Sequence, residues 1–334
     1  MNKVILHIGR HKSGTSSLQK FLYTNRLQLE EYGFYYPLNG LKGIAHHHIS
    51  LPLSKSNLKT NNLENILKTK VFLDFYSEVK TKLNKFNVIV SSEAFQNCDP
   101  KSIKYLFKDL DVKVVVYVRE QVSYLISSYS QYIQNNNSNL TIDEYEKMIF
   151  NADYLKFLKN WQNIFSNLSL SLFSREKLKN CNIIDDFLIN VLKLPENTMN
   201  VFNISETDQN PSIGWKLVEL KRLINSDLFR ISDRKTLYDS FKKLSNLKLN
   251  DETIKISENL FKILHYKYSK SNHALNKSLL IDQNLILSKL HILDKSQELS
   301  LNDSNTILQA LFELIPNKDN SHELIKKKLK LLLN

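Results

Sequence analysis

A short segment near the amino end carries residues that are suited to hold an anion. Gly9 to Ser16 reads G-R-H-K-S-G-T-S and follows the apolar run Val4–Ile8. The chain contains only six glycines, and two of them, Gly9 and Gly14, fall in this segment. Glycine is needed where a backbone turns tightly or approaches a ligand closely. From Thr15 the apolar residues recur at helical spacing, so the segment links a strand to a helix start, where backbone N–H groups bind anions.

The spelling of this segment is close to the phosphate-binding loop G-x-x-x-x-G-K-[ST], with one difference. Lys12 comes two residues before Gly14, and Thr15 stands where such a loop has its lysine. A nucleoside-triphosphate kinase needs the lysine after the second glycine to reach the β and γ phosphates. We therefore expect Lys12 to face the terminal group of a bound anion, with an ordinary strand–helix turn as the alternative.

Arg119 is a second candidate for anion binding. It directly follows the apolar run Val112–Val118, and a helix is expected to begin shortly after it. The carboxyl ends of parallel strands share one edge of a sheet, so Arg119 and Lys12 should meet at that edge, where ligands bind at a switch point. A guanidinium in that place binds phosphate well, and a purely structural ion pair is the alternative.

Candidate general bases occur in two places. His46, His47 and His48 occupy the loop after the first helix, and imidazole is suited to general base chemistry near neutral pH. Adjacent histidines do not converge easily on one metal ion, so a polar loop is the main alternative. Glu93 follows the apolar strand 88–90, on the same edge as the anion-binding candidates. It is expected to orient a histidine, act as the base or bind an acceptor, and a carboxylate near a helix start is the alternative.

The elements that must position these residues alternate between strand and helix. We expect strands over 4–8, 88–90, 112–118 and 168–173, and helices from residue 15, over 61–84, over 101–108 and from residue 120. The strands are apolar on both faces, which is typical of a parallel sheet covered by helices with right-handed crossovers. The predicted fold class is therefore α/β, a P-loop-like parallel sheet flanked by helices, with a mostly helical C-terminal part.

The carboxyl-terminal part is expected to form an appendage. We predict one domain over 1–290 and a helical appendage over 295–334. The appendage contains four apolar residues at helical spacing: Ile307, Leu308, Leu311 and Leu314. A leucine-rich stretch with several lysines follows over 324–333. We expect this stretch to pack on the domain as a helix, with contact to a membrane surface as the alternative.

The composition limits the class of protein. Of the 334 residues, 42% are hydrophobic and 24% are charged, which suits a large globular core. Two cysteines, Cys98 and Cys181, provide neither a disulfide framework nor a zinc site. No apolar run approaches the ~20 residues needed to span a bilayer. Because no signal peptide opens the sequence, we expect a soluble, cytoplasmic protein.

The charge indicates the kind of partner. A net charge of +12 favours an anionic partner such as a nucleotide, an acidic glycan, a nucleic acid or a membrane surface, with a solvated basic face as the alternative. The charge is mostly dispersed lysine, whereas nucleic-acid binding favours arginines interleaved with aromatic residues. We therefore expect no nucleic-acid partner.

Two parts of the sequence resemble a known family. Sulfotransferases that use 3′-phosphoadenosine-5′-phosphosulfate (PAPS) have a 5′-phosphosulfate-binding loop that commonly reads P-K-S/T-G-T-T/S, and His11–Ser17 is similar to it. Their second signature is a strand ending in arginine, with a serine eight residues later, which together hold the 3′-phosphate. Arg119 and Ser127 have this spacing, although Glu120-Gln121 replaces the usual Asp-Pro. The resemblance is strong over about residues 1–130.

The resemblance implies a bacterial, carbohydrate-type sulfotransferase. Such an enzyme transfers a sulfuryl group from PAPS to a hydroxyl of a polysaccharide, oligosaccharide or glycolipid, releases PAP and requires no metal. The resemblance implies that these residues bind the donor: Arg10, His11, Lys12, Ser13, Gly14, Thr15, Ser16, Arg119 and Ser127. It implies that the catalytic residues are Lys12, His47 and Glu93, the last in a segment similar to the S-S/T-E of sugar sulfotransferases.

In this interpretation Lys12 stabilises charge on the bridging oxygen as PAP leaves. His47, one of its neighbours or Glu93 removes the proton of the acceptor. Two other functions are the alternatives. A P-loop kinase of nucleosides or sugars requires a lysine directly after Gly14, where this chain has Thr15. A basic nucleic-acid-binding protein requires a recognition motif.

Overall fold

The computed structural model describes residues 2–10, 12–136, 138–174, 176–203, 213–225, 233–244, 252–278, 285–289, 291–293, 297 and 299–314. The chain forms two compact units, each assembled from separate stretches. The first unit consists of Met1–Glu120, Asp153–Gln209 and Lys270–Ile286, and the second of Gln121–Ala152, Asn210–Ser269 and Leu287–Asn334. The expected division into 1–290 and 295–334 stays a prediction.

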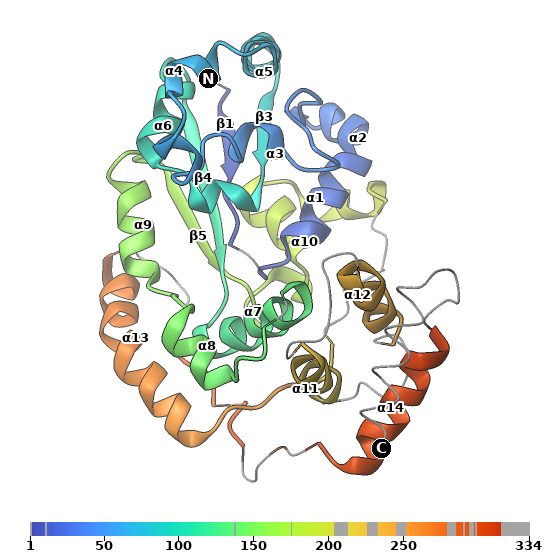
Figure 1. Cartoon of the computed structure of the whole chain (residues 1–334). Coiled ribbons are helices and arrows are strands. Elements are labelled where there is room, and N and C mark those ends of the chain that lie inside the picture. Colours follow the sequence, from blue (N-terminus) through green and yellow to red (C-terminus); the bar gives the residue numbers. More distant parts are fainter. Residues whose placement is uncertain are drawn as a thin grey trace. The chain divides into compact units, whose positions relative to one another are not determined.

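A five-stranded parallel sheet forms the centre of the first unit (Figure 1). Its strands are β1 (Val4–His7), β2 (Phe34–Tyr35), β3 (Asn87–Ser91), β4 (Val112–Val118) and β5 (Leu168–Leu172). Their order across the sheet is β2-β3-β1-β4-β5, and every neighbouring pair is parallel. The predicted α/β fold class is confirmed. Strand β2 was not expected, because two residues are too few to show a hydrophobic period.

Helices cover both faces of the sheet. Figure 1 shows α1 (Thr15–Thr24) and α10 (Ile183–Asp186) on one side of the strands, and α6 (Pro100–Leu106) and α9 (Tyr154–Gln162) on the other. Strand β1 is buried along its whole length, and β3 and β4 are buried at all but one residue each. Burial on both faces explains why these strands read as unbroken apolar runs in the sequence.

Two segments predicted as single helices are each divided into two. The other helices of the first unit are α2 (Arg26–Glu31), α3 (His47–Ser50), α4 (Leu63–Leu67) and α5 (Lys70–Lys82). The prediction of one helix over 61–84 is wrong, because Thr69 has extended backbone (ψ 149°) and separates α4 from α5. The helix expected from residue 15 is likewise interrupted at Asn25, which has non-helical backbone (φ −98°, ψ 19°) and separates α1 from α2.

Short helical turns complete the first unit. The 3-10 turns are η1 (Asn57–Lys59), η2 (Glu93–Asn97), η3 (Lys179–Cys181) and η5 (Glu196–Val201), and the π-helical turn is η4 (Phe187–Val191). Turn η2 follows β3 directly, and its first residue is Glu93. The candidate carboxylate therefore lies at the carboxyl end of β3, as the sequence predicts.

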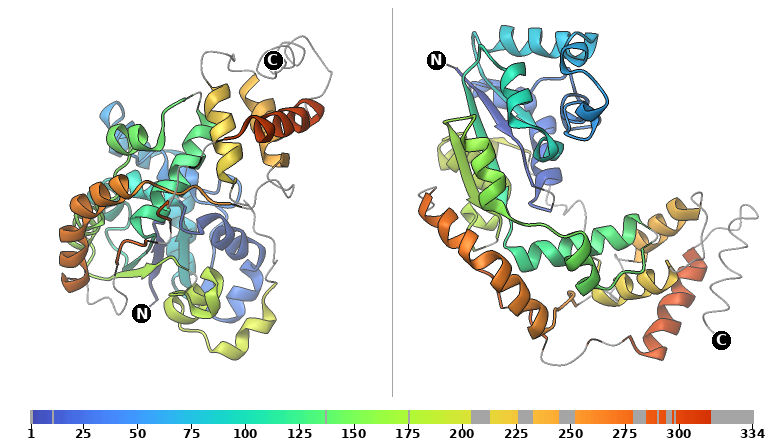
Figure 2. Two further views of the ribbon diagram at one scale, coloured as in Figure 1. Left: turned by 90° about the horizontal axis from the view of Figure 1, so that it is seen from below. Right: turned by 60° about the vertical axis from the view of Figure 1, so that its left-hand side comes forward.

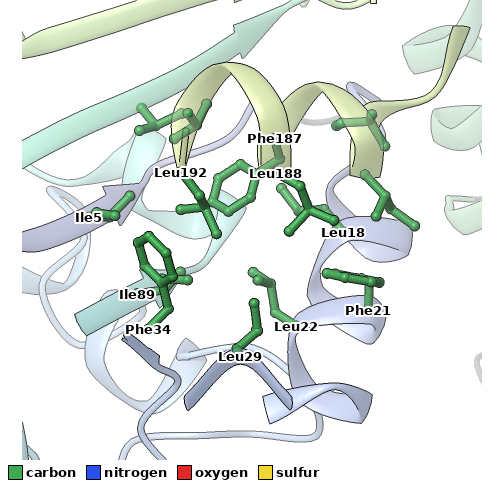
Figure 3. Close-up of a cluster of buried hydrophobic side chains, with 14 of the residues drawn as sticks. Ile5, Leu18, Phe21, Leu22, Leu29, Phe34, Ile89, Phe187, Leu188 and Leu192 are labelled. Carbon is green, nitrogen blue, oxygen red and sulfur yellow. The ribbon is translucent and has the colours of Figure 1, made fainter. Parts of the chain in front are cut away.

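A cluster of buried apolar side chains fixes α1 on one face of the sheet (Figure 3). Ile5 and Ile89 come from the strands, Leu18 and Leu22 from α1, and Phe187 from η4. Each of these five side chains is at most 3% exposed. Burial of such a side chain stabilises the fold by about 1.5–3 kcal/mol. The cluster thereby also fixes the start of α1, where the glycine-containing loop ends.

The described elements of the second unit are helical. They are α7 (Gln121–Asn135), α8 (Ile142–Met148), α11 (Trp215–Ile224), α12 (Asp233–Leu244), α13 (Glu258–Ser278), whose last residues belong to the first unit, and α14 (Leu301–Leu314). Helix α14 packs against α11 and α12 (Figure 2), and an ion pair of 2.9 Å joins Lys216 of α11 to Asp303.

The carboxyl-terminal helix predicted from apolar spacing is confirmed in its first part. Ile307, Leu308 and Leu311 of α14 are buried. The stretch 324–333, for which membrane contact was the alternative, lies outside the described residues. Among the helices that are described, none has the length and apolar character required to cross a membrane.

Candidate functional site

The carboxyl ends of β1 and β4 meet at the switch point of the sheet. The chain passes from β1 to β2 and β3 on one side and then to β4 on the other, which is where open α/β sheets bind ligands. Lys12 follows β1 and Arg119 follows β4. Nη1 of Arg119 donates a hydrogen bond of 3.5 Å to the carbonyl oxygen of Lys12. The structure therefore brings together the two cations that the sequence predicts at this edge.

Three of the described residues in the loop after β1 have left-handed backbone. These are Gly9 (φ 53°), Lys12 (φ 65°) and Gly14 (φ 71°). A Cβ atom on Gly9 would lie 2.9 Å from Cγ2 of Thr15 and 3.0 Å from Cα of Glu93. Glycine is therefore required at position 9 both for its conformation and for the close approach of the loop to the segment after β3. Lys12 adopts the same conformation with a full side chain, which is a strained arrangement.

Ser13 closes this turn from inside. Its hydroxyl donates to the carbonyl oxygen of Arg10 at 2.7 Å, and its backbone N–H donates to the same oxygen at 3.3 Å. The backbone N–H of Arg10 in turn lies 3.4 Å from the Ser13 hydroxyl. Ser13 is completely buried. Its observed contacts shape the loop, and the predicted contact with the donor stays a prediction.

The start of α1 presents backbone donors. The backbone N–H of Leu18 donates to the carbonyl oxygen of Gly14 at 3.1 Å, and this is the first bond of the helix. Gly14 has no side chain to cap the helix. The N–H groups of Thr15, Ser16 and Ser17 have no hydrogen-bond partner among the described residues. Such donors, together with the positive end of the helix dipole, make the first turn of α1 suited to bind an anion.

Lys12 and Arg119 lie side by side without an acidic partner. Within the described part of the chain, neither side chain forms an ion pair with a carboxylate. Burial lowers the pKa of the Lys12 ammonium, and the neighbouring Arg119 lowers it further. Burial also lowers the pKa of Arg119, against the opposing effects of Glu120 and Tyr154. Two partly buried positive charges of this kind are stabilised when an anion binds between them.

Two aromatic side chains lie under arginines of this site, Arg119 and Arg10. The guanidinium of Arg119 lies over the ring of Phe173, 5.9 Å from its centre. A Cβ atom on Gly14 would lie only 2.6 Å from the same ring, so Phe173 also packs against the loop. The guanidinium of Arg10 lies over the ring of Tyr154, at 5.2 Å from its centre. Arg10 was expected to contact the donor, and its observed contact is with helix α9.

Two predicted donor-binding residues are not tested by this geometry. His11 lies outside the described residues. Ser127 is on α7, eight residues after Arg119, and belongs to the second unit. The participation of both stays a prediction.

The three adjacent histidines have different environments. His46 is completely buried between the backbone N–H of Ser91, 3.2 Å from Nδ1, and the carbonyl oxygen of Pro37, 3.1 Å from Nε2. Burial lowers its pKa to about 4, so His46 is a neutral structural residue at physiological pH. His48 is exposed. His47 is half-buried and faces the carboxylate of Glu93, with 3.6 Å between Nε2 and Oε1. The structure thus distinguishes His47 from its neighbours.

Two residues that the sequence analysis missed hold the His47–Glu93 pair. Nε2 of the buried Gln19 donates to Oε2 of Glu93 at 2.9 Å. The hydroxyl of Ser92 lies 2.8 Å from Nδ1 of His47 and accepts the backbone N–H of Ala94 at 3.2 Å. The sequence does contain a sign that Gln19 has a role in the site: it is a polar residue four positions after Thr15, on the buried face of α1.

No group of three or more histidine, cysteine, aspartate or glutamate side chains in the described part of the chain is placed to hold a metal ion. What the described geometry offers is a loop suited to bind an anion, with two cations, next to a histidine–carboxylate pair. The first suits a phosphate or sulfate ester, and the second suits removal of a proton.

Comparisons with known proteins give matches among solved structures. No protein-family model matches the chain, and a search of curated proteins finds no relative. Among solved structures, the chain is similar to a sulfotransferase from Alicyclobacillus acidocaldarius, with 12% sequence identity and a TM-score of 0.41. The match covers 85% of this chain and 98% of that one. A likeness of this degree is weak, and the functional proposal rests on the site residues.

We predict that Lys12→Met stabilises the ligand-free protein and weakens anion binding. The folded state lowers the pKa of Lys12 below the usual 10.5, so between the lowered pKa and 10.5 the unfolded chain binds more protons and stability rises with pH. At every pH below that window, the buried charge lowers the free energy of unfolding by a constant amount. Removing it should raise the free energy of unfolding at pH 8 by about 1 kcal/mol. Urea unfolding measures this change, and titration with inorganic pyrophosphate measures the loss of affinity.

The matched control is Lys59→Met, because Lys59 is exposed on η1. This variant should change neither the free energy of unfolding nor the affinity for pyrophosphate by much. If Lys12→Met lowers the stability and binds pyrophosphate as well as the wild type does, Lys12 is not an uncompensated cation of an anion site.

Proposed function

We propose that this protein is a sulfotransferase that transfers a sulfuryl group from PAPS to a hydroxyl of a carbohydrate acceptor. The observation that carries the proposal is the pair of cations Lys12 and Arg119 beside the first turn of α1, neither of which forms an ion pair with a carboxylate among the described residues. A donor with phosphate groups at both ends of a ribose and a sulfate at its tip needs several anion contacts at one edge. The adjoining His47–Glu93 pair supplies a proton acceptor.

The donor is held by the loop and the end of β4. In this proposal the N–H groups of Thr15 and Ser16 bind the 5′-phosphosulfate, and Arg119 binds the 3′-phosphate. Ser127 joins Arg119 in holding the 3′-phosphate, as the resemblance to PAPS-dependent enzymes implies. Lys12 faces the bridging oxygen between phosphorus and sulfur.

The reaction is an in-line displacement at sulfur. The acceptor oxygen forms a bond to sulfur while the bond between sulfur and the bridging oxygen breaks, and PAP leaves with the electron pair of that bond. Lys12 stabilises the negative charge that develops on the bridging oxygen. The proton of the acceptor hydroxyl passes to His47 or to Glu93. As in phosphoryl transfer, most of the rate enhancement comes from positioning and charge stabilisation.

Two roles for the His47–Glu93 pair are compatible with its contacts. With the ring proton on Nδ1, His47 donates to the Ser92 hydroxyl, and Nε2 is the base. With the ring proton on Nε2, His47 faces Glu93 as a donor, and the carboxylate is the base. Gln19 holds one oxygen of Glu93 in either case. We favour His47 as the base: the Ser92 hydroxyl holds its Nδ1, and Glu93 stabilises the imidazolium that forms when Nε2 takes up the proton.

Calorimetric titration tests the donor. We expect PAP to bind in the micromolar range without metal, and ATP with magnesium to bind much more weakly. Arg119→Ala should weaken PAP binding at least about tenfold, because a charge-assisted bond contributes about 1.5–3 kcal/mol. Lys12→Ala should have a smaller effect on the product, which lacks the sulfuryl group. A chain that binds ATP with magnesium but not PAP contradicts the proposal and favours a kinase.

Arg26→Ala is the control for this titration. The Arg26 guanidinium bonds to the carbonyl oxygen of Tyr23 and lies over its ring, on α2 and away from the loop. Its loss should leave the affinity for PAP unchanged.

Transfer of radiolabelled sulfate from PAPS tests the acceptor side. We expect product with chitotetraose or dextran, and none with the non-carbohydrate probe p-nitrophenol. His47→Asn should reduce kcat by about 10²-fold and Glu93→Gln by less, with unchanged affinity for PAP, because general base catalysis contributes about 10²–10⁴-fold. The exposed neighbour provides the control, His48→Asn, which should keep full activity. A larger loss for Glu93→Gln than for His47→Asn makes Glu93 the base. Transfer to p-nitrophenol alone contradicts the carbohydrate acceptor.

A further inference from the structure

Tyr154, the first residue of α9, contacts both anion-binding segments. Its hydroxyl donates a hydrogen bond of 2.6 Å to the carbonyl oxygen of Arg119, at the end of β4. The guanidinium of Arg10, from the loop after β1, lies over the ring of Tyr154 at 5.2 Å from the ring centre. Tyr154 is 1% exposed. One buried side chain therefore touches the end of β4 and the turn after β1.

The start of α9 keeps Tyr154 in place. Asp153 caps the helix by accepting the backbone N–H of Lys156 at 3.1 Å. Phe157, three residues after Tyr154 on the same helix face, presents a second ring to the Arg10 guanidinium, at 5.0 Å. Arg10 thus lies over two rings of one rigid element, and contacts of this kind stabilise a guanidinium by about 0.5–2 kcal/mol.

The carbonyl group of Arg119 marks the point where β4 leaves the sheet. The preceding carbonyl oxygen, that of Val118, accepts the backbone N–H of Phe173 at 2.7 Å. This hydrogen bond is the last one of the ladder between β4 and β5. Beyond this bond the orientation of Arg119 depends on other contacts, and the Tyr154 hydroxyl provides one. The side chain of Arg119 in turn bonds to the carbonyl oxygen of Lys12.

Like charges make this support necessary. Arg10, Lys12 and Arg119 lie on two segments at one edge of the sheet, and Lys12 and Arg119 repel each other enough to lower the pKa of Lys12. Without a bound anion, repulsion favours separation of the two segments. A donor that had to bring them together would bind more weakly, because part of its binding free energy would be spent on ordering them.

We propose that Tyr154 is a positioning residue that holds Arg119 and the loop after β1 in their donor-binding arrangement before the donor arrives. This inference rests on the proposed function, because it assigns Arg119 to the 3′-phosphate of PAP. Tyr154 does not touch the donor, and it acts through Arg119.

The variant Tyr154→Phe separates the contribution of the hydroxyl from that of the ring. The variant keeps the aromatic surface under Arg10 and loses the bond to the Arg119 carbonyl. We expect its affinity for PAP to fall about 3- to 10-fold, the amount expected for one hydrogen bond. Its affinity for adenosine 5′-monophosphate, which lacks the 3′-phosphate, should change less than about twofold. The ratio of the two affinities is the informative quantity, because a loss of folded protein lowers both equally.

Tyr36→Phe is the matched control. Tyr36 is also 1% exposed in the first unit, and its hydroxyl donates to a carbonyl oxygen, that of Ile44, at 2.8 Å. Both variants break one buried hydroxyl–carbonyl bond, so their melting temperatures should fall by similar amounts. Only Tyr154→Phe should change the ratio of PAP to adenosine 5′-monophosphate affinity.

A double-mutant cycle with Arg119→Ala tests whether Tyr154 acts through Arg119. In the Arg119→Ala background, Tyr154→Phe should cause no further loss of PAP affinity. The same loss in both backgrounds, or an equal loss for both nucleotides, overturns the positioning role. So does a Tyr154→Phe variant that binds PAP as the wild type does. A wild-type chain that fails to bind PAP overturns the proposed function together with this inference, and the wild-type titration thereby distinguishes the two failures.

Discussion

Two positive charges held close together, with no ion pair to a carboxylate among the described residues, are the constraint that the site depends on. Lys12 and Arg119 lie at the ends of neighbouring strands, and burial lowers the pKa of both. The contacts that Arg119 does make are weaker ones: the carbonyl oxygen of Lys12 and the ring of Phe173. An anion relieves the repulsion directly, which makes binding of a multiply charged anion favourable.

The position of β1 between β3 and β4 brings the two halves of the chemistry together. The loop after β1 approaches the segment after β3 so closely that a Cβ on Gly9 would lie 3.0 Å from the Cα of Glu93. Glycine at this position thus allows the candidate anion-binding loop and the candidate proton acceptor to be close neighbours. Helix α1 connects them a second time, since its first turn presents N–H groups that have no partner among the described residues, and its next turn supplies Gln19 to Glu93. The proposed transfer between two bound substrates requires such proximity.

The sequence predicts the parts of this arrangement that depend on local patterns. Apolar runs give the long strands because helices bury both of their faces, and glycines mark the turn because it needs left-handed backbone. The two-residue strand β2 and the separation of α4 from α5 are not predictable in this way. The first is too short to show a period, and the second depends on the extended backbone at Thr69.

Contacts between segments that are distant in the sequence are also not predictable from local patterns. It places three histidines in a row without distinguishing them, and burial of His46 with exposure of His48 follows from tertiary packing. Gln19 and Ser92 become relevant only when α1 and η2 lie next to each other. Tyr154 is an ordinary helical residue in the sequence, and its bond to Arg119 spans 35 positions.

The most direct test of the account is a crystal structure of the protein with PAP. We predict that the 5′-phosphate lies at the first turn of α1, within hydrogen-bond distance of the N–H groups of Thr15 and Ser16. We further predict that the 3′-phosphate contacts the guanidinium of Arg119, and that Lys12 lies next to the 5′-phosphate. A structure in which PAP occupies another surface, with Lys12 and Arg119 free of it, would contradict the assignment of this site.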